Sequence, residues 1–169
     1  MRFVAGCQSM PLLRFISSLG NVMTSVFTET ELAVRSDNVP GAEGRVLAAI
    51  LGWGLHVRAL CSYTDGDRLM VRVVTDDAKQ AKQALACAGY ESKANPVVVV
   101  GLKNRVGAVA QLGAHLGNAN IDIVYSYASY MDDAEVVAVF KTHDDARAVK
   151  VLQSGLQSDQ HAAARSAAA

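Results

Sequence analysis

Several classes of protein are excluded by what the sequence lacks. Its three cysteines, Cys7, Cys61 and Cys87, are odd in number and widely spaced, and they form no Cys-x-x-Cys pair. This pattern predicts neither a disulfide framework nor a zinc site, and it favours reduced thiols in a cytoplasmic protein. Sixteen basic and sixteen acidic residues leave a formal net charge of zero, so no nucleic-acid partner is expected. No apolar run approaches the roughly 20 residues that cross a bilayer, so we expect no membrane partner.

Motifs for catalysis and metal binding are also missing. No nucleophile stands beside a recognisable base, and there is no phosphate-binding loop. His56 and Cys61 are five residues apart, which places them on opposite faces of a strand, and His115 and His143 converge with no other His or Cys in the sequence. We therefore expect no catalytic residues, no metal, no cofactor and a protein that is not an enzyme. An enzyme whose active site leaves no motif is a further alternative.

The two ends of the chain differ in character from its middle. The first residues contain Arg2 and Arg14, no acid and a broken apolar pattern, unlike the compact apolar run of a secretory signal. We expect residues 1–27 to be an extension outside the fold, with Met23 as a natural start. Residues 159–169 are rich in alanine and are expected to form a frayed tail.

The middle of the chain contains an internal repeat. Asn38, Gly41 and Ala42 correspond to Asn104, Gly107 and Ala108, each 66 positions later in the sequence. The apolar residues Val46, Ile50, Leu55 and Val57 correspond to Leu112, Leu116, Ile121 and Ile123 at the same offset. A period of this length is too long for a solenoid repeat and predicts two small domains in tandem. We place them at residues 28–95 and 96–158.

Both units predict the element order βαββαβ, which is the ferredoxin-like arrangement and makes the fold class α+β. In each unit, helical spacing follows a glycine-containing turn, and alternating residues follow the helix. The expected elements of the first unit are a strand at 32–36, a helix at 42–54, strands at 55–63 and 68–74, a helix at 78–89 and a strand at 90–94. Those of the second unit are a strand at 96–102, a helix at 107–116, strands at 121–129 and 135–140, a helix at 144–152 and a last strand around Leu156.

Alternation along the strands predicts which residues face the core. The odd-numbered residues from Leu55 to Tyr63 should share one face. Tyr125 and Tyr127 should share the core face of Ile121, which favours packing over nucleobase stacking. The strands at 96–100 and 135–140 are apolar on both faces, so both faces should be covered. From this pattern we expect a homodimer or larger assembly built through a sheet face.

A βαββαβ unit whose first strand enters the loop "DNVPG" resembles the ACT domain, and the second unit repeats the pattern in "NRVGA". The whole chain is similar to small standalone tandem ACT proteins. ACT domains are regulatory modules that bind amino acids, so the resemblance implies a free amino acid or similar effector as partner. It also implies a ligand held between the first strand and first helix, where one unit's loop faces its neighbour.

The candidate ligand-binding residues lie in those two loops and just after the second loop's helix. Backbone amides at a helix start can hold a carboxylate, and nearby basic and acidic side chains can take the ligand's charges. In the first loop, Asp37 and Asn38 are also good N-cap residues. The candidates are Asp37, Asn38, Val39, Pro40 and Gly41 in the first loop, Lys103, Asn104, Arg105, Val106, Gly107 and Ala108 in the second, and Asp122.

The sequence leaves two interpretations of the function. One is an amino-acid-binding regulatory protein of the tandem ACT type. The other is a structural dimerisation or interaction module that has lost its effector, and Val106, which stands where proline is usual, favours that alternative. A screen for ligands that stabilise the folded protein separates the two.

Overall fold

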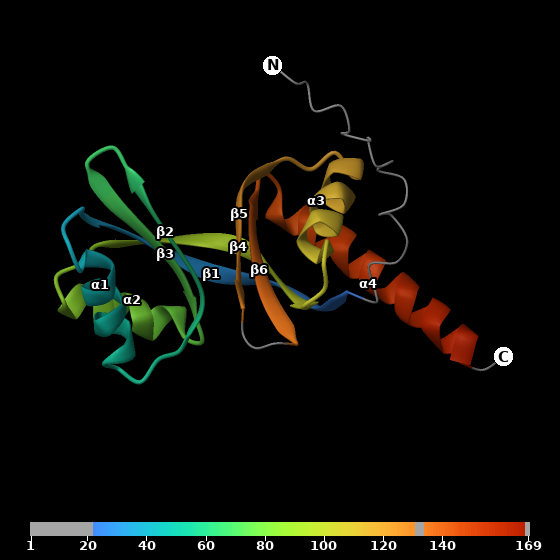
Figure 1. The fold of residues 1–169 in the computed structure, drawn as a ribbon, viewed down its shortest axis with the longest axis horizontal. Coiled ribbons are helices and arrows are strands. Elements are labelled where there is room, and N and C mark those ends of the chain that lie inside the picture. The colour runs from blue at the N-terminus through green and yellow to red at the C-terminus, as the bar shows by residue number, and fades with distance from the viewer. Residues whose placement is uncertain (1–21, 131–133, 168–169) are drawn as a thin grey trace, which may run out of the picture.

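A computed structural model describes residues 22–130 and 134–167, with side chains described as far as residue 156. It contains six strands and four helices among these residues (Figure 1). The elements are β1 (Met23–Asp37), α1 (Ala42–Leu51), β2 (Val57–Asp65), β3 (Arg68–Thr75), α2 (Ala78–Cys87), β4 (Ser92–Lys103), α3 (Ala108–Asn118), β5 (Ile123–Tyr130), β6 (Glu135–Thr142) and α4 (Asp145–Ala167).

The strands form one antiparallel sheet in the order β2-β3-β1-β4-β6-β5. The long strands β1 and β4 lie at its centre and pair with each other from Met23 opposite Leu102 to Val34 opposite Ser92. Each of them serves both halves of the repeat. The first unit contains the C-terminal part of β1, α1, β2, β3, α2 and the N-terminal part of β4. The second unit contains the C-terminal part of β4, α3, β5, β6, α4 and the N-terminal part of β1. The predicted α+β class with two ferredoxin-like units is confirmed.

The last strand of the second unit comes from a different place than expected. Leu156, expected in that strand, lies in α4, which continues through the alanine-rich residues to Ala167. The N-terminal part of β1 takes the strand's position beside β4. Residues 23–27, which we expected in an extension outside the fold, therefore belong to the sheet, and Met23 and Val26 are buried. The expectation for residues 1–21 lies outside the described residues.

Two hydrophobic cores lie under the helices, one in each unit. In Figure 1, α1 and α2 cover one end of the molecule and α3 and α4 the other, with β2, β3, β5 and β6 between them. Val46 and Ile50 of α1 and their repeat partners Leu112 and Leu116 of α3 are all completely buried in the core of their own unit. The helical spacing in the sequence also included Leu47 and Leu51, and of these Leu47 is partly buried and Leu51 is exposed. The spacing therefore predicted the centre of the buried face but not its width.

A third cluster joins the units on the side of the sheet that carries no helix. This inter-unit face consists of Ala59, Val74, Val97, Val99, Val137 and Val139. The two edge strands of the sheet also meet there, because the Leu60 amide of β2 donates to Ser129 Oγ of β5 at 3.2 Å. Both faces of β6 are thus covered within one chain. The apolar pattern is therefore explained without a second copy, and the homodimer stays a prediction.

Register shifts in β2 and β5 change the faces that alternation had predicted. The pairing of β2 with β3 shifts between Val57 and Ala59, so Val57 packs on the first core and Ala59 joins the inter-unit face. In β5 the shift lies between Ile123 and Tyr125. Ile121 accordingly lies in the second core, while Tyr127 packs on the inter-unit face. The expectation of one common face was wrong because one extra residue in a strand reverses the alternation beyond it.

Candidate functional site

The two loops that precede α1 and α3 have the same backbone conformation. The Ala42 amide donates to the Val39 carbonyl at 3.0 Å, and the Ala108 amide donates to the Arg105 carbonyl at 3.1 Å. The third residue of each turn is a glycine with positive φ, 79° at Gly41 and 84° at Gly107. These are type II turns, which require that backbone conformation at the third position. We call Val39–Ala42 and Arg105–Ala108 the helix-start turns, and both need glycine for conformational reasons alone.

Within the described part of the chain, no side chain caps the helix that follows either turn. The expected caps of α1 are used elsewhere: the Asp37 carboxylate accepts from Arg68, and the Asn38 side-chain amide donates to Thr64 Oγ1 at 3.4 Å. The N-cap position is Gly41 in α1 and Gly107 in α3. The first amide of each helix donates within its turn, and the next two amides, of Glu43 and Gly44 in α1 and of Val109 and Ala110 in α3, have no side-chain acceptor among the described residues. This arrangement favours a bound anion.

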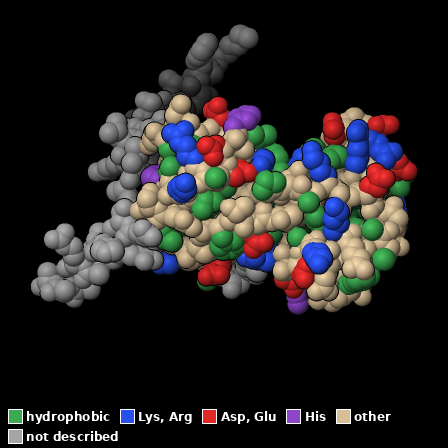
Figure 2. Space-filling view, turned by 180° about the vertical axis from the view of Figure 1, so that it is seen from behind, with side chains coloured by type: hydrophobic (Ala, Val, Ile, Leu, Met, Phe, Trp, Pro, Cys, Tyr) green, Lys and Arg blue, Asp and Glu red, His purple; other side chains and the backbone are tan. Residues whose placement is uncertain are grey.

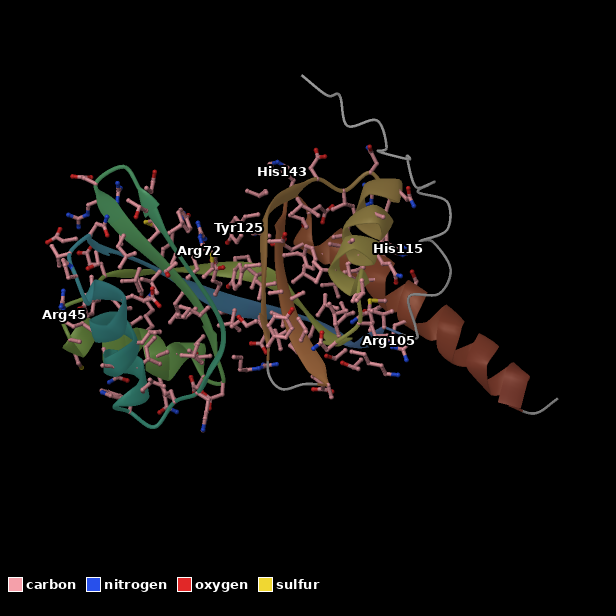
Figure 3. All side chains as sticks on the ribbon, in the orientation of Figure 1. Arg45, Arg72, Arg105, His115, Tyr125 and His143 are labelled. Carbon is pink, nitrogen blue, oxygen red and sulfur yellow. The ribbon has the colours of Figure 1, made fainter. Side chains whose placement is uncertain are left out.

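The two helix-start turns lie at opposite ends of the molecule. Asp37 ends β1, whereas the Lys103 amide donates to the carbonyl of Val22, just before β1 begins. A 15-residue strand is roughly 50 Å long. Figure 3 shows the same separation, with Arg45 of α1 and Arg105 far apart. The residues predicted to bind a ligand thus form two separate candidate sites.

Asp122 is not close to the second turn. Its carbonyl accepts a hydrogen bond from the His143 amide at 3.3 Å, just beyond the end of β6. Lys103 of β4, by contrast, lies opposite Glu135 in the strand register, at the beginning of β6. An eight-residue strand is roughly 25 Å long, so the Asp122 side chain does not reach a ligand at Arg105–Ala108 of its own chain. An acid that receives the ammonium group of such a ligand must come from elsewhere.

The side chains around the two turns differ in charge and in whether they already have interaction partners. The first turn has an acid in the first helical turn, Glu43, and its Arg45 donates to the carbonyl of Pro40 at 3.3 Å. The first helical turn of α3 has no acid. Lys103 and Arg105 are exposed, and neither forms an ion pair within the described part of the chain. The second turn is therefore the better site for an anion.

A buried polar cluster that the sequence did not predict joins the two units. Glu31 of β1 is completely buried. Its carboxylate accepts from Arg72 of β3 at 2.7 Å, from the Tyr125 hydroxyl at 2.7 Å and from the Tyr127 hydroxyl at 3.0 Å. Arg72 also lies over the Tyr125 ring, 4.2 Å from its centre. Figure 3 shows Arg72 and Tyr125 side by side between the units.

Three side chains of this cluster, those of Arg72, Tyr125 and Tyr127, have raised pKa values. Burial opposes the charge of Arg72, but hydrogen bonds to Tyr63 and Glu31 outweigh it, so the pKa of Arg72 is raised. Burial and the hydrogen bond to Glu31 raise the pKa of Tyr125, and burial and the charge of Glu31 raise the pKa of Tyr127. Both phenols stay protonated as donors at neutral pH, and none of these three groups titrates there. The cluster is suited to holding the units together, not to transferring protons.

The remaining surface offers few other sites. Among the described residues, no three His, Cys, Asp or Glu side chains are grouped as metal ligands. His56 instead pairs with Asp76 at 3.1 Å. In the part of the chain that is described, no helix combines the length and hydropathy of a membrane span. Figure 2 shows Lys and Arg mixed with Asp and Glu over the visible face, without a continuous field of one sign.

Comparisons with known proteins identify the fold. No protein-family model matches the sequence, and no curated protein matches it. Protein BT0572 from Bacteroides thetaiotaomicron superposes with a TM-score of 0.68 at 20% identity, over 78% of this chain and 90% of that one. The regulatory subunit of aspartate kinase from Thermus thermophilus superposes with a TM-score of 0.56 at 14% identity, over 79% of this chain and 97% of that one. The regulatory subunit of aspartate kinase from Thermus flavus superposes with a TM-score of 0.52 at 17% identity, over 79% of this chain and 98% of that one.

These likenesses define the class of the protein by its fold. The chain has an ACT-like fold, with two βαββαβ units in the tandem arrangement of the aspartate kinase regulatory subunits. At such low identities the likeness extends to the architecture alone, and the ligand has to be argued from this chain's own residues.

Proposed function

We propose that this protein is a regulatory, non-catalytic protein that binds a free amino acid or a similar small effector at its helix-start turns. The turn Arg105–Ala108 is the principal site. The observation that carries the proposal is the uncapped N-terminus of α3 beside two exposed cations, Lys103 and Arg105, which have no acidic partner within the described residues. The resemblance to ACT domains, which bind amino acids, supports the ligand class.

The chemistry of the turn suits a carboxylate. The amide of Ala108 is used within the turn, and that of Gln111 donates to the Gly107 carbonyl at 2.9 Å. The amides of Val109 and Ala110 are therefore the ones that face a ligand. The positive end of the α3 dipole and the charges of Lys103 and Arg105 add to the attraction. Gly107 carries no side chain above these amides, so the carboxylate approaches them directly.

A second copy of the chain would complete this site. The first unit lies toward the far end of β1, so it offers no wall to a ligand at Arg105–Ala108. Val106 in the turn is fully exposed, and Val109 in the first turn of α3 is also exposed. Exposed apolar residues beside an open binding site favour a contact with another protein surface. The proposal therefore includes a homodimer in which the ligand lies between copies.

The same exposed valines favour a second candidate function. Val106 in the second turn corresponds to Pro40 in the first turn. Its apolar side chain is fully exposed, and the turn conformation does not require it. A module that only pairs with another protein would also use such a surface. That module would bind no amino acid, and this difference separates the two functions.

A thermal-shift screen against the twenty amino acids tests the proposal. A ligand that binds only the folded state adds about 2.7 kcal/mol of stability at a hundredfold excess over its Kd, which raises the melting temperature by several degrees. The proposal predicts at least one such amino acid. If all twenty leave the melting temperature unchanged at 10 mM, a level about a hundredfold above a typical Kd of 100 μM, the interaction module is the better description.

Charge variants then test the location. Lys103→Gln together with Arg105→Gln should weaken binding of that amino acid at least about tenfold, because two charged partners of the carboxylate are lost. Lys79→Gln together with Lys150→Gln is the matched control, since both lysines are exposed on other helices and the net charge change is the same. Equal binding by both double variants would place the ligand elsewhere.

A further inference from the structure

A cleft of about 610 Å³ opens between the units, next to the buried Glu31 cluster. Its walls come from β1, β3 and the beginning of β4 in the first unit and from β5 and β6 in the second. Arg72 and Tyr125 mark its position in Figure 3. The volume is within the range of small-molecule sites, roughly 300–1,000 Å³. No candidate residue of the helix-start turns lines it.

The charged residues that line this cleft are mostly basic. They are Arg35, Arg72, Lys93 and Lys141, with Glu91 as the acid. Two of the four cations already have partners, because Arg72 pairs with Glu31, and Lys141 pairs with Asp145 and also donates to the Pro96 carbonyl. Arg35 and Lys93 are exposed, and neither has an acidic partner within ion-pair distance among the described residues. With respect to the described residues, Arg35 and Lys93 are thus free to bind a ligand.

Three charged groups of the cleft, Arg35, Lys93 and Glu91, lie within reach of one small molecule. Ala33 of β1 lies opposite Lys93 of β4, and Val34 lies opposite Ser92. Arg35 is two residues from Ala33, so it points to the same face as Lys93. Glu91 directly precedes β4 and lines the same cleft. Side chains at directly opposed positions start about 5 Å apart, and diagonal neighbours about 7–8 Å apart. Arg35, Lys93 and Glu91 therefore surround one small area.

We propose that this cleft binds a small dicarboxylate, and that an acidic amino acid fits it best. The two carboxylates would pair with Arg35 and Lys93, and the ammonium group would pair with Glu91. Met70 and Val124, which also line the cleft, would contact the methylene carbons of the ligand. This is a second site, separate from the helix-start turns.

The position of the cleft links its occupancy to the arrangement of the units. Lys93 and Arg35 belong to the first unit, while Val124 and Tyr125 belong to the second. A ligand that contacts both walls binds the described arrangement better than one in which the units have moved apart, and it shifts the population toward the former.

Calorimetric titration of the full chain at low salt, with L-glutamate, glutarate and L-glutamine as probes, tests the proposal. L-Glutamate should bind more tightly than glutarate, which lacks the ammonium group. L-Glutamine, with one carboxylate fewer, should bind at least about tenfold more weakly than L-glutamate. If neither dicarboxylate binds at about 10 mM, which corresponds to an affinity too weak for a built site, the proposal is wrong.

Three variants assign the contacts. Arg35→Gln together with Lys93→Gln should weaken both dicarboxylates at least about tenfold. Glu91→Gln should weaken L-glutamate and leave glutarate unchanged or tighter. The control Lys79→Gln with Lys150→Gln removes the same charge outside the cleft and should retain wild-type affinity.

The opposite results overturn the proposal in identifiable ways. Wild-type affinity in the Arg35 and Lys93 double variant would show that the dicarboxylate does not bind in the cleft. Equal effects of Glu91→Gln on both probes would overturn the assignment to an acidic amino acid. Loss of L-glutamate binding only in the Lys103 and Arg105 double variant would locate it at the second helix-start turn, which would support the proposed function and contradict the cleft.

Discussion

The buried Glu31 cluster and the two helix-start turns differ in whether their polar groups have partners. In the cluster, Glu31 is completely buried, and its carboxylate accepts hydrogen bonds from Arg72, Tyr125 and Tyr127 of both units. At the turns, the first amides of α1 and α3 have no side-chain cap. Paired buried groups stabilise a fold, whereas open exposed groups are available to a ligand. Substitutions in the middle should therefore change stability, and substitutions at the ends should change binding.

The two turns also differ from each other although their backbones agree. Pro40-Gly41 and Val106-Gly107 both produce a type II turn, so the glycine and not the proline is the shared requirement. The side chains around the first turn are paired with residues of its own unit, whereas Lys103 and Arg105 at the second form no ion pair with any described residue. A repeat in backbone conformation thus does not imply a repeat in binding capacity.

The largest effect is expected in the buried Glu31 cluster. Glu31→Ala should lower the free energy of unfolding by about 3–5 kcal/mol, because Arg72 is left as a charged group without its buried partner. Glu31→Gln keeps an acceptor for the tyrosines and should cost less. Urea unfolding measured by circular dichroism gives both values. A loss below about 1 kcal/mol for Glu31→Ala, the value of an exposed pair, would mean that the cluster does not hold the units together.

The glycine of the second turn should show a smaller effect on stability and a clear effect on binding. Gly107→Ala places a side chain at a positive φ and should cost about 1 kcal/mol. It also covers the open amides, so affinity for the amino acid should fall at least about tenfold. Gly113→Ala is the control, because it lies inside α3 with open space around it, and it should stabilise the helix by up to about 1 kcal/mol.

Thermal unfolding and calorimetric titration of both glycine variants would separate the two roles of Gly107. Unchanged affinity in Gly107→Ala, with the expected drop in melting temperature, would mean that the glycine serves only the turn.

Part of this picture was accessible from the sequence. The repeat of Asn-x-x-Gly-Ala at a fixed offset and the helical spacing after it predicted the two units and the position of both turns. The exchange of the last strand was not accessible, because residues 23–30 pair with residues that lie about seventy positions later and show no local sign of it. The bulges in β2 and β5 were missed because the apolar alternation continues through them.

The polar groups were harder to predict than the apolar ones. A glutamate in a strand is expected to face the solvent. The partners that bury Glu31 become available only because the sheet brings β5 close to β2. Asp122 was associated with the second turn by its position after the helix, although a helix of 11 residues separates its ends by roughly 16 Å. Contacts between distant segments decide both cases.

A still smaller effect is expected for the pair between Lys141 and Asp145, which lies beside the cleft. Burial favours the neutral form of Asp145, but hydrogen bonds from Lys141 and Thr142 outweigh it and hold the pKa of this carboxyl below its usual range. A lowered pKa in the folded state gives stability that is present above the unfolded value of 3.8 and is lost as the pH falls below it. Asp145→Asn should therefore be less stable than the wild type at pH 7, by no more than about 1 kcal/mol.

Urea unfolding at pH 7 and pH 3 would test this. The difference between the wild type and Asp145→Asn should narrow at pH 3, and a difference that does not depend on pH would show that the charge of Asp145 contributes nothing.

The binding site at the second helix-start turn is tested most directly by nuclear magnetic resonance of the backbone amides of the full chain, during titration with the amino acid that the thermal screen identifies. The amides of residues 105–110 should shift most, since the carboxylate contacts the N-terminus of α3. Smaller shifts are expected at residues 39–44, where the same backbone lacks free cations. If the amide signals of residues 105–110 do not shift while the protein is saturated with ligand, the second helix-start turn is not the binding site.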